Sequence, residues 1–199
     1  MSPIFDVDDF DHPNLCHKLK LLSHHHQQLQ MKLGFSWIKA HVPNAVLIGG
    51  CAVVHYLSPD SDRELTPDMD MMVDDTDSIR ERMDSQGIKY TELSHHLGLL
   101  VQDFNVDLLD ASRGNVELNK TIVNSAIAFT IDGILIRVIS PELLVIMKIE
   151  LSRQKDIDDA YILLQSGSLS ETKYNYYVDL LKDHLTEYDT HISNSLFLR

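Results

Sequence analysis

A short acidic stretch in the first half of the chain places two carboxylates at alternate positions among apolar residues. It reads RELTPDMDMMVDD over positions 63–75, where Met69 and Met71 each follow an aspartate, Asp68 and Asp70. Successive side chains of a β-strand point to opposite faces, so the two methionines turn to the core and the two aspartates share the other face. Their carboxylates would then lie about 6 to 7 Å apart along the strand.

Two like charges at that spacing destabilise a fold unless an opposite charge joins them. A divalent cation provides that charge, and Mg²⁺ or Mn²⁺ prefers carboxylate oxygens, waters and substrate phosphates as ligands. The pattern therefore predicts a metal at Asp68 and Asp70. The later stretch FNVDLLDA offers a third carboxylate, Asp107, which alternates with apolar residues in a strand-like pattern. We assign Asp103 to the preceding turn and Asp110 to the following loop.

A pair of glycines precedes the acidic strand. In LIGGCAVVHYL, an apolar strand over 45–48 is followed by Gly49 and Gly50 and then by a predicted short helix from Cys51. Glycines let backbone N–H groups approach a phosphate closely, and the N-terminus of the following helix adds its dipole. An ordinary tight turn explains the same two glycines equally well. What favours a phosphate-binding role is their place shortly before the paired aspartates.

The elements that must position these residues alternate between strands and helices. We expect an N-terminal helix from Pro13 to about Gly34 with a further turn or two, six strands that include a hairpin turning at Asp132-Gly133, and helices in the last third. This is an α/β (α+β) fold with a mixed sheet of about five or six strands flanked by helices. Its predicted parts are an N-terminal helical segment over 1–43, a core over 44–140 and a C-terminal helical region over 141–199.

The composition indicates a globular protein. A chain of 199 residues with 44% hydrophobic content suits one domain with a sizeable core. It has no apolar run near the roughly 18 residues of a membrane span and no signal-peptide core at its N-terminus, so we expect no membrane contact. Cys16 and Cys51 are too few for a disulfide framework or a cysteine metal site. We expect a reduced, cytoplasmic protein.

The charge is negative overall but unevenly distributed. The formal net charge is −13, which argues against general coating of nucleic acid. Residues 12–59 nevertheless contain no Asp or Glu, and they carry four lysines: Lys18, Lys20, Lys32 and Lys39. This acid-free segment either meets something anionic, such as RNA, or complements the acidic body of the protein itself.

Taken together, these motifs resemble the DNA polymerase β-like nucleotidyltransferase superfamily. The likeness lies in the glycine turn, the pattern Arg-x-x-Thr-x-Asp-x-Asp and a lone aspartate on a later strand, and it covers about residues 44–165. The stretch SPELLVIMKIELSRQKDIDDAYILL further resembles the Lys…Arg-x-Lys-Asp-x-x-Asp helix of small bacterial members, including type IV toxin (abortive-infection) nucleotidyltransferases. The matching positions there are Lys148, Arg153, Lys155, Asp156 and Asp159. Many members place Ser second in the glycine turn, where Gly50 stands here, so a phosphate contact would come from the backbone alone.

The resemblance implies transfer of a nucleoside monophosphate from an NTP such as ATP to an acceptor hydroxyl, with release of pyrophosphate. Asp68 and Asp70 would bind the Mg²⁺ that carries the nucleotide, and with Asp107 a second ion that activates the acceptor hydroxyl. Asp107 also stands where a general base would. The residues expected to contact the nucleotide are Gly49, Gly50, Arg63, Lys148 and Lys155.

Several alternatives stay open from the sequence. Arg63 either pairs with Asp68 or reaches a phosphate, and Thr66 forms a local hydrogen bond. Lys148 and Lys155 share a face if their helix is continuous, or they form a solvated pair. The acceptor is an RNA end, a protein hydroxyl or an aminoglycoside-like small molecule. Other functions are a nucleotide-binding protein or toxin–antitoxin partner without transferase activity, with an antitoxin as its partner, and a metal-dependent hydrolase.

Overall fold

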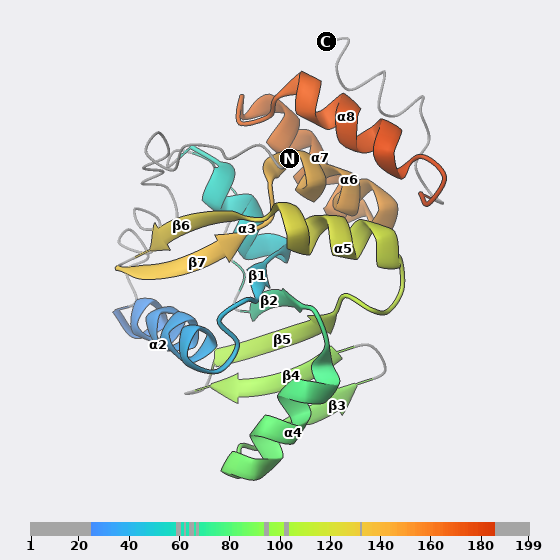
Figure 1. Cartoon of the computed structure of the whole chain (residues 1–199). Coiled ribbons are helices and arrows are strands. Elements are labelled where there is room, and N and C mark those ends of the chain that lie inside the picture. Colours follow the sequence, from blue (N-terminus) through green and yellow to red (C-terminus); the bar gives the residue numbers. More distant parts are fainter. Residues whose placement is uncertain are drawn as a thin grey trace.

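The residues that the computed structural model describes contain one mixed sheet of seven strands, in the order β3-β4-β5-β2-β1-β7-β6 (Figure 1). The strands are β1 Val46–Leu47, β2 Asp68–Val73, β3 Thr91–Leu93, β4 His96–Val101, β5 Phe104–Asp110, β6 Ile127–Ile131 and β7 Ile134–Val138. The pairs β1–β7 and β2–β5 are parallel and the other neighbours are antiparallel. The predicted mixed α/β sheet is confirmed, with one strand more than the five or six expected.

The described residues are 25–58, 61, 63, 66, 68–93, 96–101, 104–131 and 133–185. Within them, no helix has both the length and the hydrophobicity that crossing a membrane requires. The predicted helical stretch over 13–24, with Lys18 and Lys20, and the cysteine at position 16 lie outside the described residues. The predicted turn residues Asp103 and Asp132 do so as well.

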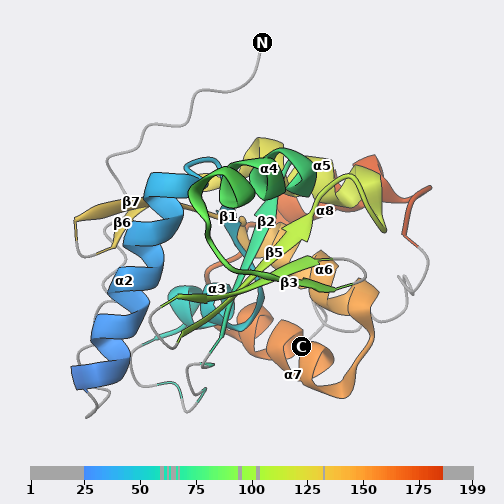
Figure 2. The ribbon, with the colours of Figure 1, turned by 90° about the horizontal axis from the view of Figure 1, so that it is seen from below.

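Seven helices occupy the described residues. They are α2 His25–His41, α3 Gly49–Tyr56, α4 Thr76–Gln86, α5 Val116–Ser125, α6 Pro141–Leu151, α7 Gln154–Gln165 and α8 Glu171–Leu181. Figure 2 shows α3 and α7 on one side of the sheet and α4 on the other. Gly34 does not end the N-terminal helix, because α2 continues to His41.

The helix starts follow local capping chemistry. The Ser140 hydroxyl accepts a hydrogen bond from the N–H of Leu143, and Pro141 occupies the first turn of α6, both of which are common at helix starts. Helix α5, which the sequence interpretation missed, begins in the same way because the side chain of Asn115 accepts from the N–H of Leu118. Its position matters, because α5 forms one wall of the cleft described below.

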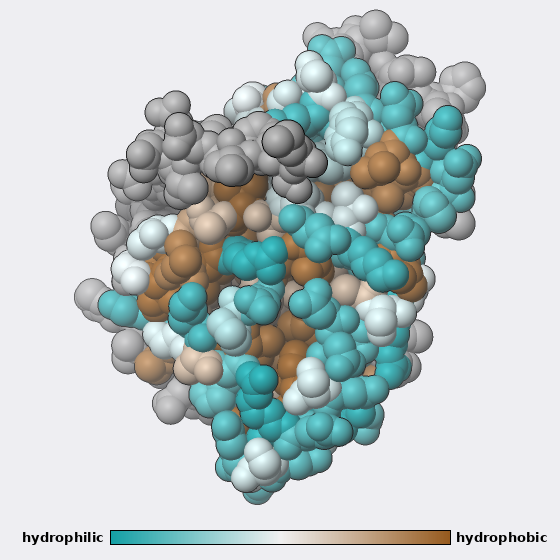
Figure 3. Space-filling view, in the orientation of Figure 1, coloured by the Kyte–Doolittle hydropathy of each residue, from teal (hydrophilic) through white to brown (hydrophobic). Residues whose placement is uncertain are grey.

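The alternation predicted for the acidic strand is the alternation observed. Met69 and Met71 on β2 are fully buried, whereas Asp68 and Asp70 on its other face are half-buried. The acidic strand is therefore supported by the core from one side and open on the other. On the side of the molecule seen in Figure 1, apolar surface is confined to patches between polar side chains, one of them over α8 (Figure 3).

Candidate active site

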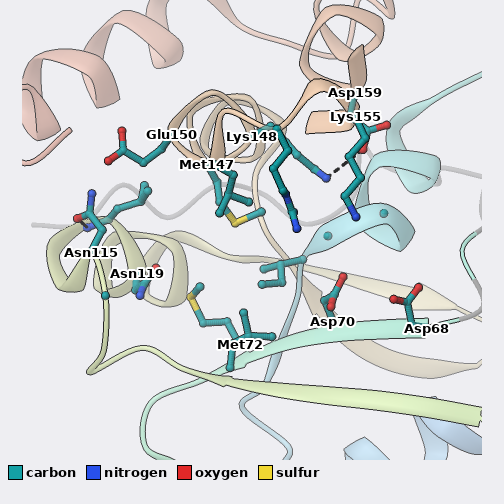
Figure 4. A pocket seen from close by; sticks show the side chains of 18 of the residues that line it. Asp68, Asp70, Met72, Asn115, Asn119, Met147, Lys148, Glu150, Lys155 and Asp159 are labelled. Atoms are coloured by element: carbon teal, nitrogen blue, oxygen red, sulfur yellow. Dashed lines mark hydrogen bonds and ion pairs between the residues drawn. The ribbon is translucent and has the colours of Figure 1, made fainter. Parts of the chain in front are cut away.

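A cleft of about 490 Å³ opens above strand β2. Its floor includes Asp68, Asp70 and Met72 from β2, and its walls come from the start of α3, from α5, and from α6 and α7 (Figure 4). All five residues expected from the sequence to contact a nucleotide line it: Gly49, Gly50, Arg63, Lys148 and Lys155. The cleft thus collects residues from four separate stretches of the chain.

Three carboxylates lie on neighbouring strands, and we call Asp68, Asp70 and Asp107 the carboxylate floor. Strand β5 runs parallel to β2, with Asp107 directly opposite Asp70 and Asn105 opposite Asp68. Residues paired in this way point to the same face of a sheet, about 5 Å apart between strands. Asp107 does not itself line the cleft, and its side chain is 31% exposed beside it.

The electrostatics of the carboxylate floor follow from this crowding. Burial, together with the charges of Asp68 and Asp107, raises the pKa of Asp70 to about 6, even though Lys148 and Lys155 act in the opposite direction. The pKa of Asp107 is also raised, chiefly by burial, while His96 lowers it and Asp68 raises it. Each group would hold its negative charge more easily with a cation nearby.

The glycine pair starts helix α3 rather than forming a separate turn before it, which corrects the sequence prediction. Gly49 has φ +66, and a Cβ atom added there would lie 2.0 Å from Oδ2 of Asp70. A Cβ atom on Gly50 would lie 2.7 Å from Cγ2 of Thr66. Both glycines are therefore needed for the close approach of the acidic strand to the N-terminus of α3, where free backbone N–H groups favour anions.

The backbone of Asp68 is held by two side chains. The Cys51 thiol donates a hydrogen bond to the Asp68 carbonyl oxygen at 3.2 Å, and the Thr66 hydroxyl donates to the same oxygen at 3.3 Å. The predicted local hydrogen bond of Thr66 is therefore confirmed. Burial raises the pKa of the Cys51 thiol to about 12, so it acts as a neutral donor.

Five charged side chains form an ion-pair network on the opposite wall: Arg63, Lys148, Arg153, Asp156 and Asp159. Nζ of Lys148 lies 2.8 Å from Oδ1 of Asp156 and 2.9 Å from Oδ2 of Asp159. Nε of Arg63 lies 2.7 Å from Oδ1 of Asp159, and Arg153 pairs with Asp156. Burial would raise the pKa of Asp156, but hydrogen bonds from Arg153 and Lys148 hold it below its usual range.

This network changes the interpretation of three predicted contacts. Arg63 pairs with Asp159, not with Asp68. The helix carrying the two lysines is interrupted at Ser152, which has φ 55, so Lys148 and Lys155 do not share a continuous helical face. Lys148 is buried, which excludes a solvated lysine pair, whereas Lys155 is exposed and has no ion pair with any described residue.

The other end of the cleft is apolar and then acidic, a feature that the sequence interpretation missed. We call it the far arm: Met72 and Met147 face each other across it, and Leu109 and Leu118 also line it (Figure 4). Its outer end carries Asn115, Asn119 and Glu150. No sequence signal links these residues, because they lie on β2, β5, α5 and α6 and meet only in the folded chain.

His96 is a second feature that the sequence did not reveal. It is the first residue of β4, and its Nε2 atom is 3.8 Å from Oδ1 of Asp107. Gly98, which pairs with Asp107 across the two strands, leaves room for that carboxylate. His96 therefore flanks the third carboxylate on the side away from Asp70.

The donors of the carboxylate floor suit a hard divalent cation, since they are carboxylate oxygens only. Among the described residues, however, no three His, Cys, Asp or Glu side chains are gathered closely enough to hold a metal ion by themselves. Burial and the neighbouring carboxylates raise the pKa of Asp70, so a bound cation would favour its charged form. The residues therefore fit a metal that takes its remaining ligands from a bound phosphate and water.

Comparisons with known proteins bear on the family and the fold of the chain. The family model described as "Nucleotidyl transferase of unknown function (DUF2204)" matches residues 30–199. No curated protein matches the chain significantly by sequence. Among solved structures, an antigenic nucleotidyltransferase-like protein from Paracoccidioides brasiliensis is similar, with 16% identity and a TM-score of 0.50 over 87% of this chain and 92% of that one. The antibiotic-resistance factor ANT(2'')-Ia is similar too, with 14% identity and a TM-score of 0.50 over 77% of this chain and 92% of that one.

Proposed function

Because the chain belongs to this family of nucleotidyl transferases, we propose that it moves a nucleoside monophosphate from an NTP to an acceptor hydroxyl, with release of pyrophosphate and with help from a divalent cation. The observation that carries the proposal is the pairing of Asp70 with Asp107 on parallel strands, directly beneath the N-terminus of α3. A nucleotidyl transfer needs this juxtaposition of carboxylates and phosphate-binding backbone.

The triphosphate would bind at the basic end of the cleft. The first N–H groups of α3, at Gly49 and Gly50, are free of helix hydrogen bonds and carry the positive end of the helix dipole. Lys155 is exposed and unpaired within the described part of the chain, so it can move to a phosphate without breaking an ion pair. Lys148 and Arg63 would contribute as fixed positive charges from within the ion-pair network.

The carboxylate floor would hold the cation, with Mg²⁺ or Mn²⁺ as the fitting ions. A cation bound there supplies charge that stabilises the α-phosphate and the leaving pyrophosphate. Asp107 stands at the edge of the cleft, where it would orient the acceptor hydroxyl or take its proton. The acceptor would therefore approach from the β4 side, past His96.

The acceptor itself is a hydroxyl of RNA, of a protein or of a small molecule. If the acceptor is RNA, the acid-free segment would bind it; of its lysines, Lys32 and Lys39 are exposed on α2. No described residue of α2 lines the cleft, and α2 and α5 lie far apart in both Figure 1 and Figure 2. An RNA acceptor would thus have to extend from the cleft to α2 around the molecule.

A nucleotide-binding partner protein without transferase activity is the second candidate. It is favoured by one observation, the lack of three converging metal-binding side chains among the described residues. Such a protein would bind the NTP through the glycine turn and the lysines but would label no acceptor. A toxin that is controlled by an antitoxin fits either candidate.

The test is to incubate the protein with Mg²⁺, α-³²P-labelled NTPs and cell extract, and to identify the fraction that becomes labelled. Replacing Asp70 with Asn should reduce labelling on the order of 10³-fold, since metal-assisted catalysis contributes several kcal/mol. Asp74→Asn is the matched control, because Asp74 is an exposed aspartate just past β2 and does not line the cleft. Labelling that survives Asp70→Asn would refute the assignment, and NTP binding without labelling would favour the second candidate.

A further inference from the structure

The two ends of the cleft have opposite chemistry. The basic end has the glycine turn and the amino groups of Lys148 and Lys155, whereas the outer end has Glu150 (Figure 4). A neighbouring hollow shares Glu150 and adds Glu117, which lies 3.8 Å from Nζ of Lys120. A triphosphate is repelled from a carboxylate end and attracted to the basic end, so a bound NTP has one favoured direction.

The far arm between these ends suits a flat apolar ring. Met72 and Met147, which are 3% and 7% exposed, come from the strand and the helix on opposite sides of the arm. Thioether side chains pack well against aromatic faces. Met147 and Glu150 lie three residues apart on α6, so they share a helical face and both reach the cleft. A ring held by Met147 therefore presents its edge toward Glu150.

The polar side chains of the helix walls at the outer end act as hydrogen-bond acceptors. The Nδ2 group of Asn119 donates to the Arg113 carbonyl oxygen at 2.7 Å, and its Oδ1 atom is an acceptor on a residue that lines the cleft. Asn115 donates to the His184 carbonyl oxygen and accepts from the N–H of Leu118. The Glu150 carboxylate accepts only. Arg113 adds a positively charged donor group to this part of the cleft, with Nε 3.4 Å from Oδ2 of Asp110.

We propose that the far arm binds the nucleobase of the NTP and selects guanine, with Glu150 reading its edge; this inference rests on the proposed function. Guanine presents two adjacent donors, N1–H and the N2 amino group, which a carboxylate can accept together. It also presents the acceptors O6 and N7, to which an arginine such as Arg113 pairs well. Adenine and cytosine offer a carboxylate only an amino group, and uracil offers one N–H between two repelling carbonyl oxygens.

The test measures equilibrium binding of GTP, ITP, ATP, CTP and UTP to the full chain with Mg²⁺, together with transfer from each. We expect GTP to bind at least about tenfold more tightly than UTP, since a bidentate base contact discriminates by roughly that factor or more. ITP lacks the N2 amino group and should fall between them. Glu150→Gln keeps the shape of the side chain but replaces one acceptor by a donor, and should remove most of the GTP preference. Glu81→Gln, an exposed glutamate on α4, is the matched control and should leave it unchanged.

The outcomes separate this inference from the function on which it rests. Equal binding of all five nucleotides, or a GTP preference that Glu150→Gln leaves intact, overturns guanine selection while transfer persists. A Glu150→Gln effect on the acceptor alone, with nucleotide binding unchanged, overturns it too, because the far arm would then hold the acceptor. Absence of both binding and transfer for every NTP overturns the function and the inference together. The ITP comparison uses the wild-type protein, so it stands even if a variant folds poorly.

Discussion

The carboxylate floor and the ion-pair network face each other across the cleft and handle buried charge in opposite ways. In the network, Asp156 and Asp159 each have basic partners, and Lys148 lies within 2.9 Å of both. On the floor, no described basic side chain lies within ion-pair distance of Asp68 or Asp70. The charges of the network are therefore balanced within the chain, whereas those of the floor need a ligand from outside.

The shifts in pKa express the same contrast. The pKa of Asp156 is held low by its partners although burial opposes this, and the pKa of Asp70 is raised to about 6 by burial and by its acidic neighbours. Removing a network residue should therefore destabilise the fold, while neutralising a floor residue should stabilise it. Four experiments can test this contrast.

Replacing Lys148 with Met should lower the free energy of unfolding by about 3 to 5 kcal/mol, because it leaves two buried aspartates short of positive charge. Urea denaturation measures this change. Lys155→Met is the matched control, since Lys155 is exposed and has no described ion-pair partner, and it should change stability by less than about 0.5 kcal/mol. Equal losses of stability in the two variants would contradict the special importance of the network for the fold.

Adding Mg²⁺ and an NTP together should raise the melting temperature of the wild-type protein, because ligands that bind only the folded state stabilise it. At a hundred times the dissociation constant the gain is about 2.7 kcal/mol. Thermal unfolding with the metal alone, the NTP alone and both measures it. Asp70→Asn should abolish the rise and Asp74→Asn should retain it. A wild-type protein without any shift would show that the floor is not a metal site.

Without metal, the stability of the wild-type protein should fall as the pH rises from about 4 through about 6. The sign follows because the folded-state pKa of Asp70, about 6, exceeds the ordinary value of 3.8, so the folded protein holds a proton that the unfolded chain has released. Asp70→Asn should remove this fall and be more stable at pH 8 by about 1 to 2 kcal/mol. Melting temperatures across this pH range in EDTA test it; a less stable variant at pH 8 would contradict it.

Replacing Cys51 with Ala should have the smallest effect, a loss of about 1 kcal/mol, because it removes one neutral hydrogen bond to the Asp68 carbonyl and leaves that of Thr66 in place. Chemical denaturation measures the loss. Cys51→Ser restores a donor of similar size and should recover part of it. If Cys51→Ala were as costly as Lys148→Met, the floor would depend on its own internal contacts as much as the network does.

The sequence predicted the floor well because its signal is local. The alternation of Asp68 and Asp70 with two methionines is contained within one strand, and β2 begins and ends where the pattern does. The capping of α6 by Ser140 and the β6–β7 hairpin were predictable for the same reason. The assignment of metal and catalytic roles to the floor stays a prediction.

The network and the far arm could not be predicted, because their signals are not local. Arg63 and Asp159 are 96 residues apart in the chain, and only the packed fold brings them together. Strand β3 has three exposed residues and so shows no alternation of apolar and polar positions. Helix α5 carried one weak signal, an Asn at its start, which alone does not distinguish a cap from a turn.

The parallel pairing of β2 with β5 also limits how this chain can change over generations. A shift of β2 by one residue against β5 would turn Asp68 and Asp70 toward the core and Met69 and Met71 toward the cleft, a double loss. Strand β2 can accept substitutions one at a time, but it cannot accept a change in its length. Variation in length among descendants of this sequence should therefore be found in the connections between elements, while the spacing from Asp68 to Asp70 stays fixed.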